Sequence, residues 1–287
     1  HCDGQHRGAL LRGRHPDEAE VNKLHPLVWA AGFFSIIPVP PLVEVEPVQA
    51  RRALAWLPTL GLLIGILAGI VGAVVALVSQ AQLLAAALAV VAMQGLVGAM
   101  HLDGLADTAD GLAALGSRKD GRDTPRALEI MRQPDVGAIG VVTIVATLLL
   151  QTSALASSPD AASLLVLVTI GGFLGRATVL SASRRGVPSA RPGGFGALFA
   201  DTSSPAIVGA HYCTAALLAG GCGWWLAGLP GALGLISAAI IAVSAAELWT
   251  RRLVRVFGGV TGDVFGALVE VTTTIWLVSA AIVLAAP

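Results

Sequence analysis

The chain has 287 residues, of which 55% are hydrophobic and only 13% are charged. Soluble globular proteins carry about 25% charged residues, so this composition argues against an ordinary soluble domain. A mean hydropathy of +0.78 favours a helical membrane protein embedded in a lipid bilayer. The 18 basic and 18 acidic residues balance, whereas a nucleic-acid-binding protein shows a basic excess, so no nucleic-acid partner is expected.

The N-terminal region differs from the rest of the chain. Residues 1–25 are polar and lack an apolar stretch of signal-peptide length, so we expect a mobile tail. Segment 27–42 is apolar, but it is too short to cross a bilayer and contains three prolines. We therefore expect it to be an interfacial or re-entrant segment. Residues 26–287 are predicted to form a single integral membrane domain that carries the catalytic site.

Seven later stretches are apolar and long enough to cross a bilayer as helices, which takes about 20 residues each. They are residues 57–78, 82–102, 136–157, 162–182, 206–227, 231–249 and 264–285. The predicted fold class is all-α, a polytopic membrane protein with about seven transmembrane helices and the short N-terminal segment.

The segments between these stretches alternate in charge. Residues 1–56, 103–135, 183–205 and 250–263, together with Arg176, hold all 18 Lys and Arg, and the segments on the opposite side hold none. The positive-inside rule therefore predicts a multi-pass protein of the cell membrane (the inner or plasma membrane) with a cytoplasmic N-terminus and a cytoplasmic active site.

Three carboxylates follow the second predicted span. Asp103, Asp107 and Asp110 lie at positions i, i+4 and i+7, which places them within about 60° of arc on one helix face. We call them the Asp stripe. Three carboxylates on one face repel one another unless a cation lies among them, and Mg²⁺ prefers oxygen ligands and often joins carboxylates to substrate phosphates. The stripe therefore predicts a magnesium site.

Two further acids belong to the seventh predicted span. Asp263 lies at its cytoplasmic end and is a candidate metal ligand, although it could equally cap the helix. Glu270 lies two turns deeper and is a candidate substrate contact, because an ionisable residue inside the membrane is functional by default. A simple pairing of Glu270 with a polar neighbour is the alternative. Glu247 and Arg251 are spaced for an ion pair on one helix.

Basic residues on the same side are candidates for binding phosphate, because the planar guanidinium group matches phosphate oxygens. They are Arg126 and Arg132 before the third span, and Arg176 inside the fourth. Gly194 belongs to a loop in which glycines flanked by arginines could bind a phosphate through backbone N–H groups. His101 directly precedes the Asp stripe and could relay a proton.

These residues converge on one membrane face and favour metal-assisted transfer on a diphosphate, in which a carboxylate or histidine accepts the proton of the attacking hydroxyl. The sequence also resembles the cobalamin synthase family (adenosylcobinamide-GDP ribazoletransferases). The resemblance rests on FFSIIPVP at 33–40, WLPTLG at 56–61, HLDGLADTADG at 101–111, LEIMR at 128–132 and GGVTGDVFGA at 258–267. These motifs occur in the family's order.

The resemblance implies a Mg²⁺-dependent membrane enzyme that joins adenosylcobinamide-GDP to α-ribazole or its 5′-phosphate and releases GMP. The Asp stripe and Asp263 would then hold Mg²⁺ and the diphosphate, and Arg132 and Arg176 would contact phosphate. Which acid is the base stays open, and a homodimer is one candidate assembly.

Two alternatives belong to other classes. A CDP-alcohol phosphotransferase of lipid synthesis also uses spaced Asp residues and Mg²⁺, but its motif has Ala-Arg after the Asp-Gly pair, and Leu112 and Ala113 follow here. A cation transporter would use intramembrane acids along a pathway near the bilayer midplane, whereas the acids here cluster at one face.

Overall fold

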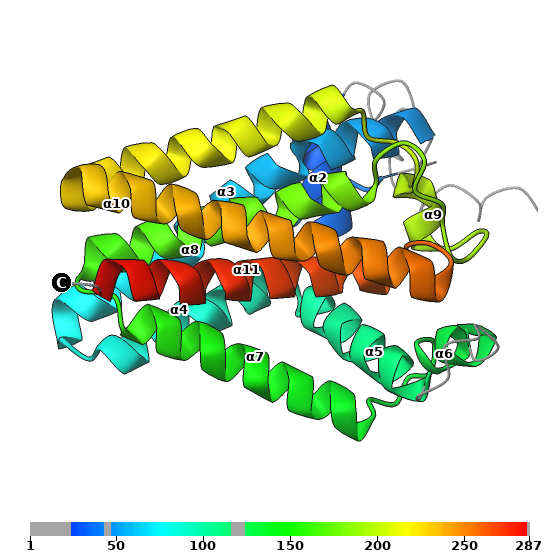
Figure 1. Cartoon of the computed structure of the whole chain (residues 1–287), viewed down its shortest axis with the longest axis horizontal. Helices are drawn as coiled ribbons and strands as arrows, with labels where there is room; N and C mark the ends of the chain where they lie inside the picture. Colours follow the sequence, from blue (N-terminus) through cyan, green and yellow to red (C-terminus); the bar gives the residue numbers. More distant parts are fainter. Residues whose placement is uncertain (1–23, 43–46, 116–123, 286–287) are drawn as a thin grey trace, which may run out of the picture.

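The computed structural model describes residues 24–42, 47–115 and 124–285. Within these ranges the regular structure is helical, with no β-sheet, and the prediction of an all-α fold is confirmed. The long helices lie side by side along the long axis of the molecule (Figure 1). The C-terminus lies at one end of the bundle, and the short helices α6 (Thr124–Ile130) and α9 (Phe195–Phe199) lie at the other.

Five of the described helices are long and apolar enough to cross a membrane. They are α3 (Pro47–Ser79), α7 (Ala138–Ala156), α8 (Ala161–Ala182), α10 (Pro205–Phe257) and α11 (Gly262–Ala285). A bent pair of helices, α4 (Gln82–Leu96) and α5 (Met100–Ala114), would raise the number to six. The chain is therefore a multi-pass membrane protein, and the number seven stays a prediction.

Helix α10 contains two of the predicted spans. Its backbone departs from helical geometry at Ala227 and Gly228, between the predicted spans 206–227 and 231–249. The two parts of α10 on either side of this kink run back along each other (Figure 1). We call residues 205–226 the first arm and residues 229–257 the second arm.

The predicted span 82–102 is wrong as a single helix. Helix α4 ends at Leu96, α5 begins at Met100, and their axes differ by 88°. Gly98 and Ala99 between them have φ values of +60° and +56°, in the left-handed region that ends a helix. The polar Asp stripe therefore lies on a separate short helix.

The N-terminal apolar segment forms a short helix. Helix α2 (Pro26–Phe34) has nine residues, well short of the length needed to cross a bilayer, and it packs against α3. Trp29 and Phe34 are buried in the core. The structure thus agrees that this segment does not span the membrane, while residues 1–23 of the predicted tail lie outside the described residues.

Glycines bring α3 and α8 into backbone contact. A Cβ atom added to Gly65 would lie 2.8 Å from the Cα of Thr169 and 2.8 Å from the carbonyl oxygen of Val168. Gly61 and Gly69 approach the α8 backbone in the same way, and Gly72 faces the side chain of Leu164 in α8. Small residues at such spacing let membrane helices pack closely, where dispersion rather than the hydrophobic effect drives association.

This contact predicts that Gly65→Ala destabilises the bundle. The added methyl group overlaps the α8 backbone, and overpacking of this kind costs about 1–3 kcal/mol. Thermal unfolding of the purified protein in detergent would show a lower midpoint. The control is Gly95→Ala in α4, where an added Cβ meets nothing within 4 Å and the midpoint should stay or rise. Equal midpoints for the two variants would contradict this role of Gly65.

Candidate functional site

Close packing of α5 against α11 builds the site. A Cβ on Gly104 of α5 would lie 2.6 Å from the carbonyl oxygen of Asp263 and 2.9 Å from its Cα. On the facing helix, a Cβ on Gly266 would lie 3.1 Å from the Cα of His101. The two glycines therefore let the helices touch, and they bring Asp263 beside the Asp stripe although the two are far apart in sequence.

Asp103 and Asp107 have free carboxylates in this arrangement. Asp103 is exposed and Asp107 is half-buried, and neither side chain has a hydrogen-bond or ion-pair partner within the described ranges. The charges of Asp263, Asp103 and Asp110 act unfavourably on the carboxylate of Asp107, and among the described residues only Arg191 opposes them. A cation or a cation-bearing ligand at this position would relieve the repulsion.

Asp110 has a different environment from the rest of the stripe. Its carboxylate accepts hydrogen bonds from the backbone N–H groups of Gly137 (2.7 Å) and Gly140 (2.9 Å). These N–H groups belong to the first turn of α7, where they have no partner within their own helix, and a negative charge there is favoured by the helix dipole. Asp110 thus fixes α7 to α5.

Asp263 forms an ion pair with Arg191. Arg191 donates from Nη1 to Asp263 (3.1 Å) and from Nη2 to the carbonyl oxygen of Leu128 in α6 (2.7 Å). The hydroxyl of Thr261 also donates to Asp263 (3.2 Å). Our sequence reasoning did not single out Arg191, although it lies in the arginine- and glycine-containing loop around Gly194 that drew attention for phosphate binding.

Glu270 and Arg176 lie inside the bundle. Glu270 is 3% exposed, and its carboxylate accepts hydrogen bonds from the side-chain amides of Gln94 in α4 (3.1 and 3.2 Å) and Gln151 in α7 (2.9 Å). Arg176 is 1% exposed, donates to the carbonyl of Gly172 and lies within electrostatic range of Glu270. These contacts match the alternative in which Glu270 joins polar neighbours, and Arg176 is not at the surface.

His101 lines a cavity between α5 and α11. The cavity has a volume of about 190 Å³, and its wall includes the rings of Phe34, Phe195 and Phe265 together with Asp263. His101 is buried, and its Nδ1 has no hydrogen-bond partner. His101 and Asp103 are two positions apart in the sequence, which is about 200° around a helix, so the two side chains lie on opposite faces of α5. The cavity is therefore mainly apolar, with three phenylalanine rings and with His101 and Asp263 as its polar residues.

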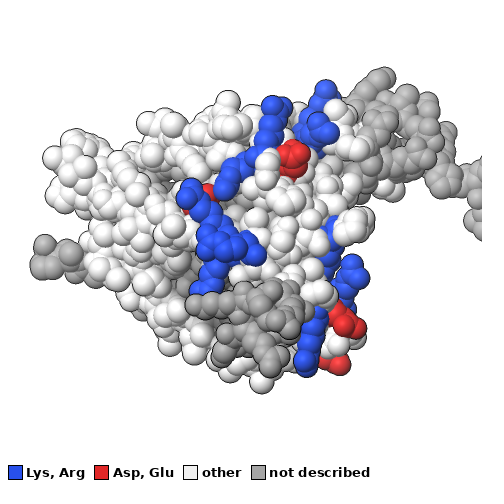
Figure 2. Space-filling model, turned by 45° about the vertical axis from the view of Figure 1, so that its right-hand side comes forward, with Lys and Arg blue, Asp and Glu red and all other residues white. Residues whose placement is uncertain are grey.

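Exposed arginines surround this end of the bundle. Figure 2 shows basic side chains gathered across it, whereas most of the remaining surface in view is uncharged. Arg126 on α6 (Thr124–Ile130) and Arg132 in the following turn are both exposed. Gly194 precedes the short helix α9 (Phe195–Phe199), and nothing crowds it. The predicted basic candidates are thus at the surface, except Arg176.

The carboxylate oxygens of the site are ligands of the kind that a hard cation prefers, but few of them are available. Among the described residues, no three His, Cys, Asp or Glu side chains lie close enough to hold a metal ion. Asp110 and Asp263 are engaged elsewhere, which leaves the oxygens of Asp103 and Asp107. Mg²⁺ is usually held by one or two carboxylates together with substrate phosphates and water, so this pair suits a metal that arrives with a diphosphate.

Comparison with known proteins agrees with these features. A profile of the cobalamin-5-phosphate synthase family matches residues 26–281. The chain belongs to this family. As a family member it is a transferase of cobalamin biosynthesis, and the matched region includes α5, most of α11 and every candidate site residue.

Individual relatives align with this chain over most of their length. An adenosylcobinamide-GDP ribazoletransferase of Frankia casuarinae is 36% identical over 274 residues, covering 91% of this chain and 97% of the relative. One of Pseudomonas putida is 37% identical over 249 residues, with 85% and 93% covered. One of Roseiflexus sp. is 36% identical over 271 residues, with 91% and 90% covered. No solved structure matches significantly.

The different partners of the stripe residues predict different effects on stability. Asp110→Ala removes the acceptor for two N–H groups of α7, and losing such a cap costs about 1–2 kcal/mol. Asp103→Ala removes an exposed carboxylate without a partner and should leave the unfolding midpoint unchanged or slightly higher. Thermal unfolding of both variants in the same detergent makes the comparison. An equal loss in both would contradict the separate role given to Asp110.

Proposed function

We propose that the chain transfers the adenosylcobinamide-phosphate group of adenosylcobinamide-GDP to α-ribazole or α-ribazole 5′-phosphate and releases GMP. The relatives named above carry this activity in their names. The observation that supports it most is the pair of carboxylates, Asp103 and Asp107, at the arginine-rich end of the bundle, which have no partner among the residues that the structure describes. Such a pair beside basic residues suits a reaction on a diphosphate.

The proposed reaction breaks a phosphoanhydride bond and forms a phosphate ester bond. The 3′-hydroxyl oxygen of the ribazole attacks the phosphorus that bears cobinamide, and the bond from this phosphorus to the bridging oxygen breaks. GMP leaves with the bridging oxygen, and a carboxylate of the Asp stripe or Asp263 accepts the proton of the attacking hydroxyl. Arg126 and Arg132 are exposed at this end and are proposed to bind phosphate oxygens of the substrates.

Magnesium is proposed as the cofactor. Asp103 and Asp107 would hold it together with diphosphate oxygens, and when bound it neutralises the charge on those oxygens. In this proposal Asp110 and Asp263 do not bind the metal directly. Asp110 positions α7, and Asp263 positions Arg191. The arginine-rich end, and with it the active site, is proposed to face the cytoplasm on the basis of the positive-inside rule.

The aromatic cavity beside Asp263 is proposed to receive the base of the ribazole. Apolar cavities with a few polar groups are typical of small-molecule sites, and the rings of Phe34 and Phe195 lie 5.8 Å apart at its wall. His101 would accept or donate one hydrogen bond to the bound nucleoside. We propose this role in place of the proton relay suggested by the sequence, because His101 and Asp103 lie on opposite faces of α5.

Release of GMP tests the function. In liposomes with adenosylcobinamide-GDP, α-ribazole phosphate and Mg²⁺, the chain should release GMP and form a cobalamin product, and EDTA should stop both. Asp103→Asn and Asp107→Asn should each lower kcat by at least about 100-fold, the range of a lost general base or charge-stabilising group. Asp135→Asn, which changes an exposed acid outside the stripe, is the matched control.

Two outcomes would overturn the proposal. Folded protein that releases no GMP would contradict the assigned reaction, and CDP-linked lipid substrates and cation flux would then be assayed. GMP release that survives both Asp103→Asn and Asp107→Asn would separate the activity from the stripe.

A change at His101 should affect binding more than turnover. His101→Gln keeps a polar group of similar length but alters the hydrogen bond available in the cavity, so we expect KM for the ribazole to rise about tenfold, the usual effect of one lost hydrogen bond in a buried site. The KM for adenosylcobinamide-GDP should change little. A large fall in kcat with an unchanged KM for the ribazole would instead favour proton transfer by His101.

A further inference from the structure

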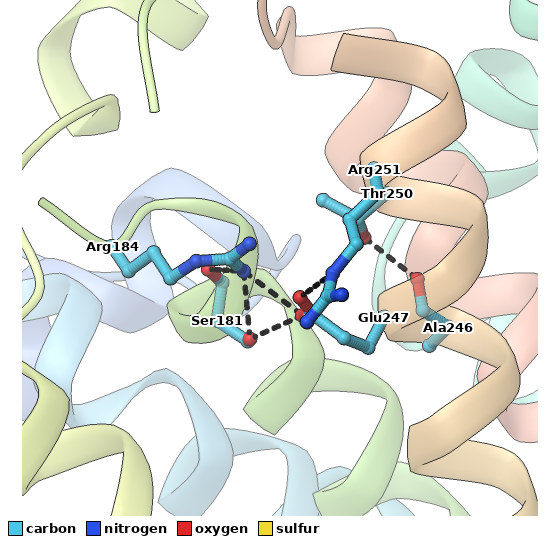
Figure 3. Close-up of polar contacts among 6 residues, drawn as sticks. All are labelled: Ser181, Arg184, Ala246, Glu247, Thr250 and Arg251. Carbon is cyan, nitrogen blue, oxygen red and sulfur yellow. Dashed lines mark hydrogen bonds and ion pairs between the residues drawn. The ribbon is translucent and has the colours of Figure 1, made fainter. Parts of the chain in front are cut away.

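A second polar cluster lies at the same end of the molecule, away from the Asp stripe. Glu247 in the second arm of α10 accepts hydrogen bonds from Arg184 at the end of α8 (2.9 Å) and from Nε of Arg251 one turn further along α10 (2.8 Å). The hydroxyl of Ser181 donates to the same carboxylate (3.1 Å). Figure 3 shows the two arginines approaching Glu247 from different segments, Arg184 from just after α8 and Arg251 from α10, and the predicted pairing of Glu247 with Arg251 is confirmed.

This cluster forms the wall of an open cavity. Its volume is about 480 Å³, and Tyr212, Val243, Ser244 and Leu248 complete the lining. A second cavity of about 140 Å³ shares Tyr212, Val243 and Ser244 with the first. Because three lining residues are common, the two cavities form one groove, which runs between the two arms of α10 and along α8.

The deeper part of the groove is apolar. Apart from the shared residues, its lining contains only aliphatic side chains: Leu174, Ala215, Ala216, Ile236, Ala239 and Ile240. Ile240 is 59% exposed, so the groove opens on the outer surface of the bundle. Ile236 and Arg251 are both on the second arm, and at 1.5 Å per residue the distance between them is about 22 Å. One leaflet of a bilayer has a hydrocarbon thickness of about 15 Å.

The mouth of the groove carries a surplus of positive charge. Two guanidinium groups share the single carboxylate of Glu247, and the side chain of Arg251 is 63% exposed. Arg185 and Arg252, each one residue further along the chain, are also exposed but line neither cavity. An occupant should therefore combine an anionic group at the arginines with an aliphatic chain along the alanine-lined part.

We propose that the groove between the arms of α10 binds an anionic phospholipid from the leaflet on the arginine-rich side. The phosphate lies at Arg184 and Arg251, and one acyl chain lies along Ala216 and Ala239. The cavity lining includes no residue of α5 or α11, so this site is separate from the proposed reaction. A bound lipid would fill the space that the described residues leave open between the arms.

Native mass spectrometry of the full chain in detergent tests the proposal. The protein is titrated with phosphatidylglycerol and, separately, with phosphatidylcholine of the same acyl chains. We expect phosphatidylglycerol to bind at least tenfold more tightly. Arg184→Gln with Arg251→Gln should weaken that binding by about 30-fold, from roughly fivefold for each basic residue near an anionic lipid.

Two further variants separate the site from general attraction and from misfolding. Arg185→Gln with Arg252→Gln removes the same charge one residue away from the groove and should keep the binding of phosphatidylglycerol. Ala216→Phe keeps every charge but fills the apolar part, and it should lose the lipid. Unfolding midpoints identify any variant that is not folded, and GMP release is measured in parallel because this proposal does not depend on the reaction.

Four results would overturn the proposal. The first is equal binding of phosphatidylglycerol and phosphatidylcholine, and the second is an equal loss of phosphatidylglycerol binding in the Arg185→Gln, Arg252→Gln variant. The third is full binding of the lipid by Ala216→Phe. The fourth is displacement of the lipid by millimolar inorganic phosphate, which would indicate a site for a free anion. If the groove were instead covered by a second copy of the chain, the spectra would show a dimer that binds no lipid and that Ala216→Phe dissociates.

Discussion

The backbone contact between α5 and α11 is the constraint on which the site depends. Gly104 faces Asp263 so closely that a single methyl group would separate the helices. This contact holds the Asp stripe beside an acid from the other end of the sequence. It also requires α5 to leave the direction of α4, and the left-handed residues Gly98 and Ala99 provide the turn of 88°. A polar helix could not continue along the apolar path of α4 without burying its carboxylates in lipid.

Partners distinguish the acids that hold the fold from those that are free to react. Glu270 has amide donors from two helices, Asp110 has two backbone N–H groups, and Asp263 has Arg191. A charge inside a membrane protein is tolerated when such partners are present, so these three acids join helices to one another. Asp103 and Asp107 have none within the described part of the chain. Their mutual repulsion is a cost that folding alone does not explain, and a cationic ligand would remove it.

The sequence predicted much of this arrangement because membrane helices follow simple rules. Hydropathy located the apolar helices, helical periodicity placed the Asp stripe on one face, and the spacing of Glu247 and Arg251 indicated their ion pair. The bend after Leu96 was missed because Ala99 carries no signal for a left-handed conformation. The positions of Arg176 and Arg191 could not be predicted, because burial and pairing with Asp263 depend on which helices become neighbours. Periodicity describes one helix, whereas these contacts join several.

The excess of arginine at one end also shows why charge sorting alone does not assign roles. The positive-inside rule accounts for the whole set without separating its members. In the structure, Arg191 neutralises Asp263, and Arg176 is buried near Glu270. Arg184 and Arg251 share the carboxylate of Glu247, beside the groove on the outer surface of the bundle. Arg126 and Arg132 are exposed near the stripe. An anionic lipid and an anionic substrate would both bind at this end of the protein. To be recognised separately, each needs its own arginines. The arginines beside the groove and those near the Asp stripe have different partners, which meets this need.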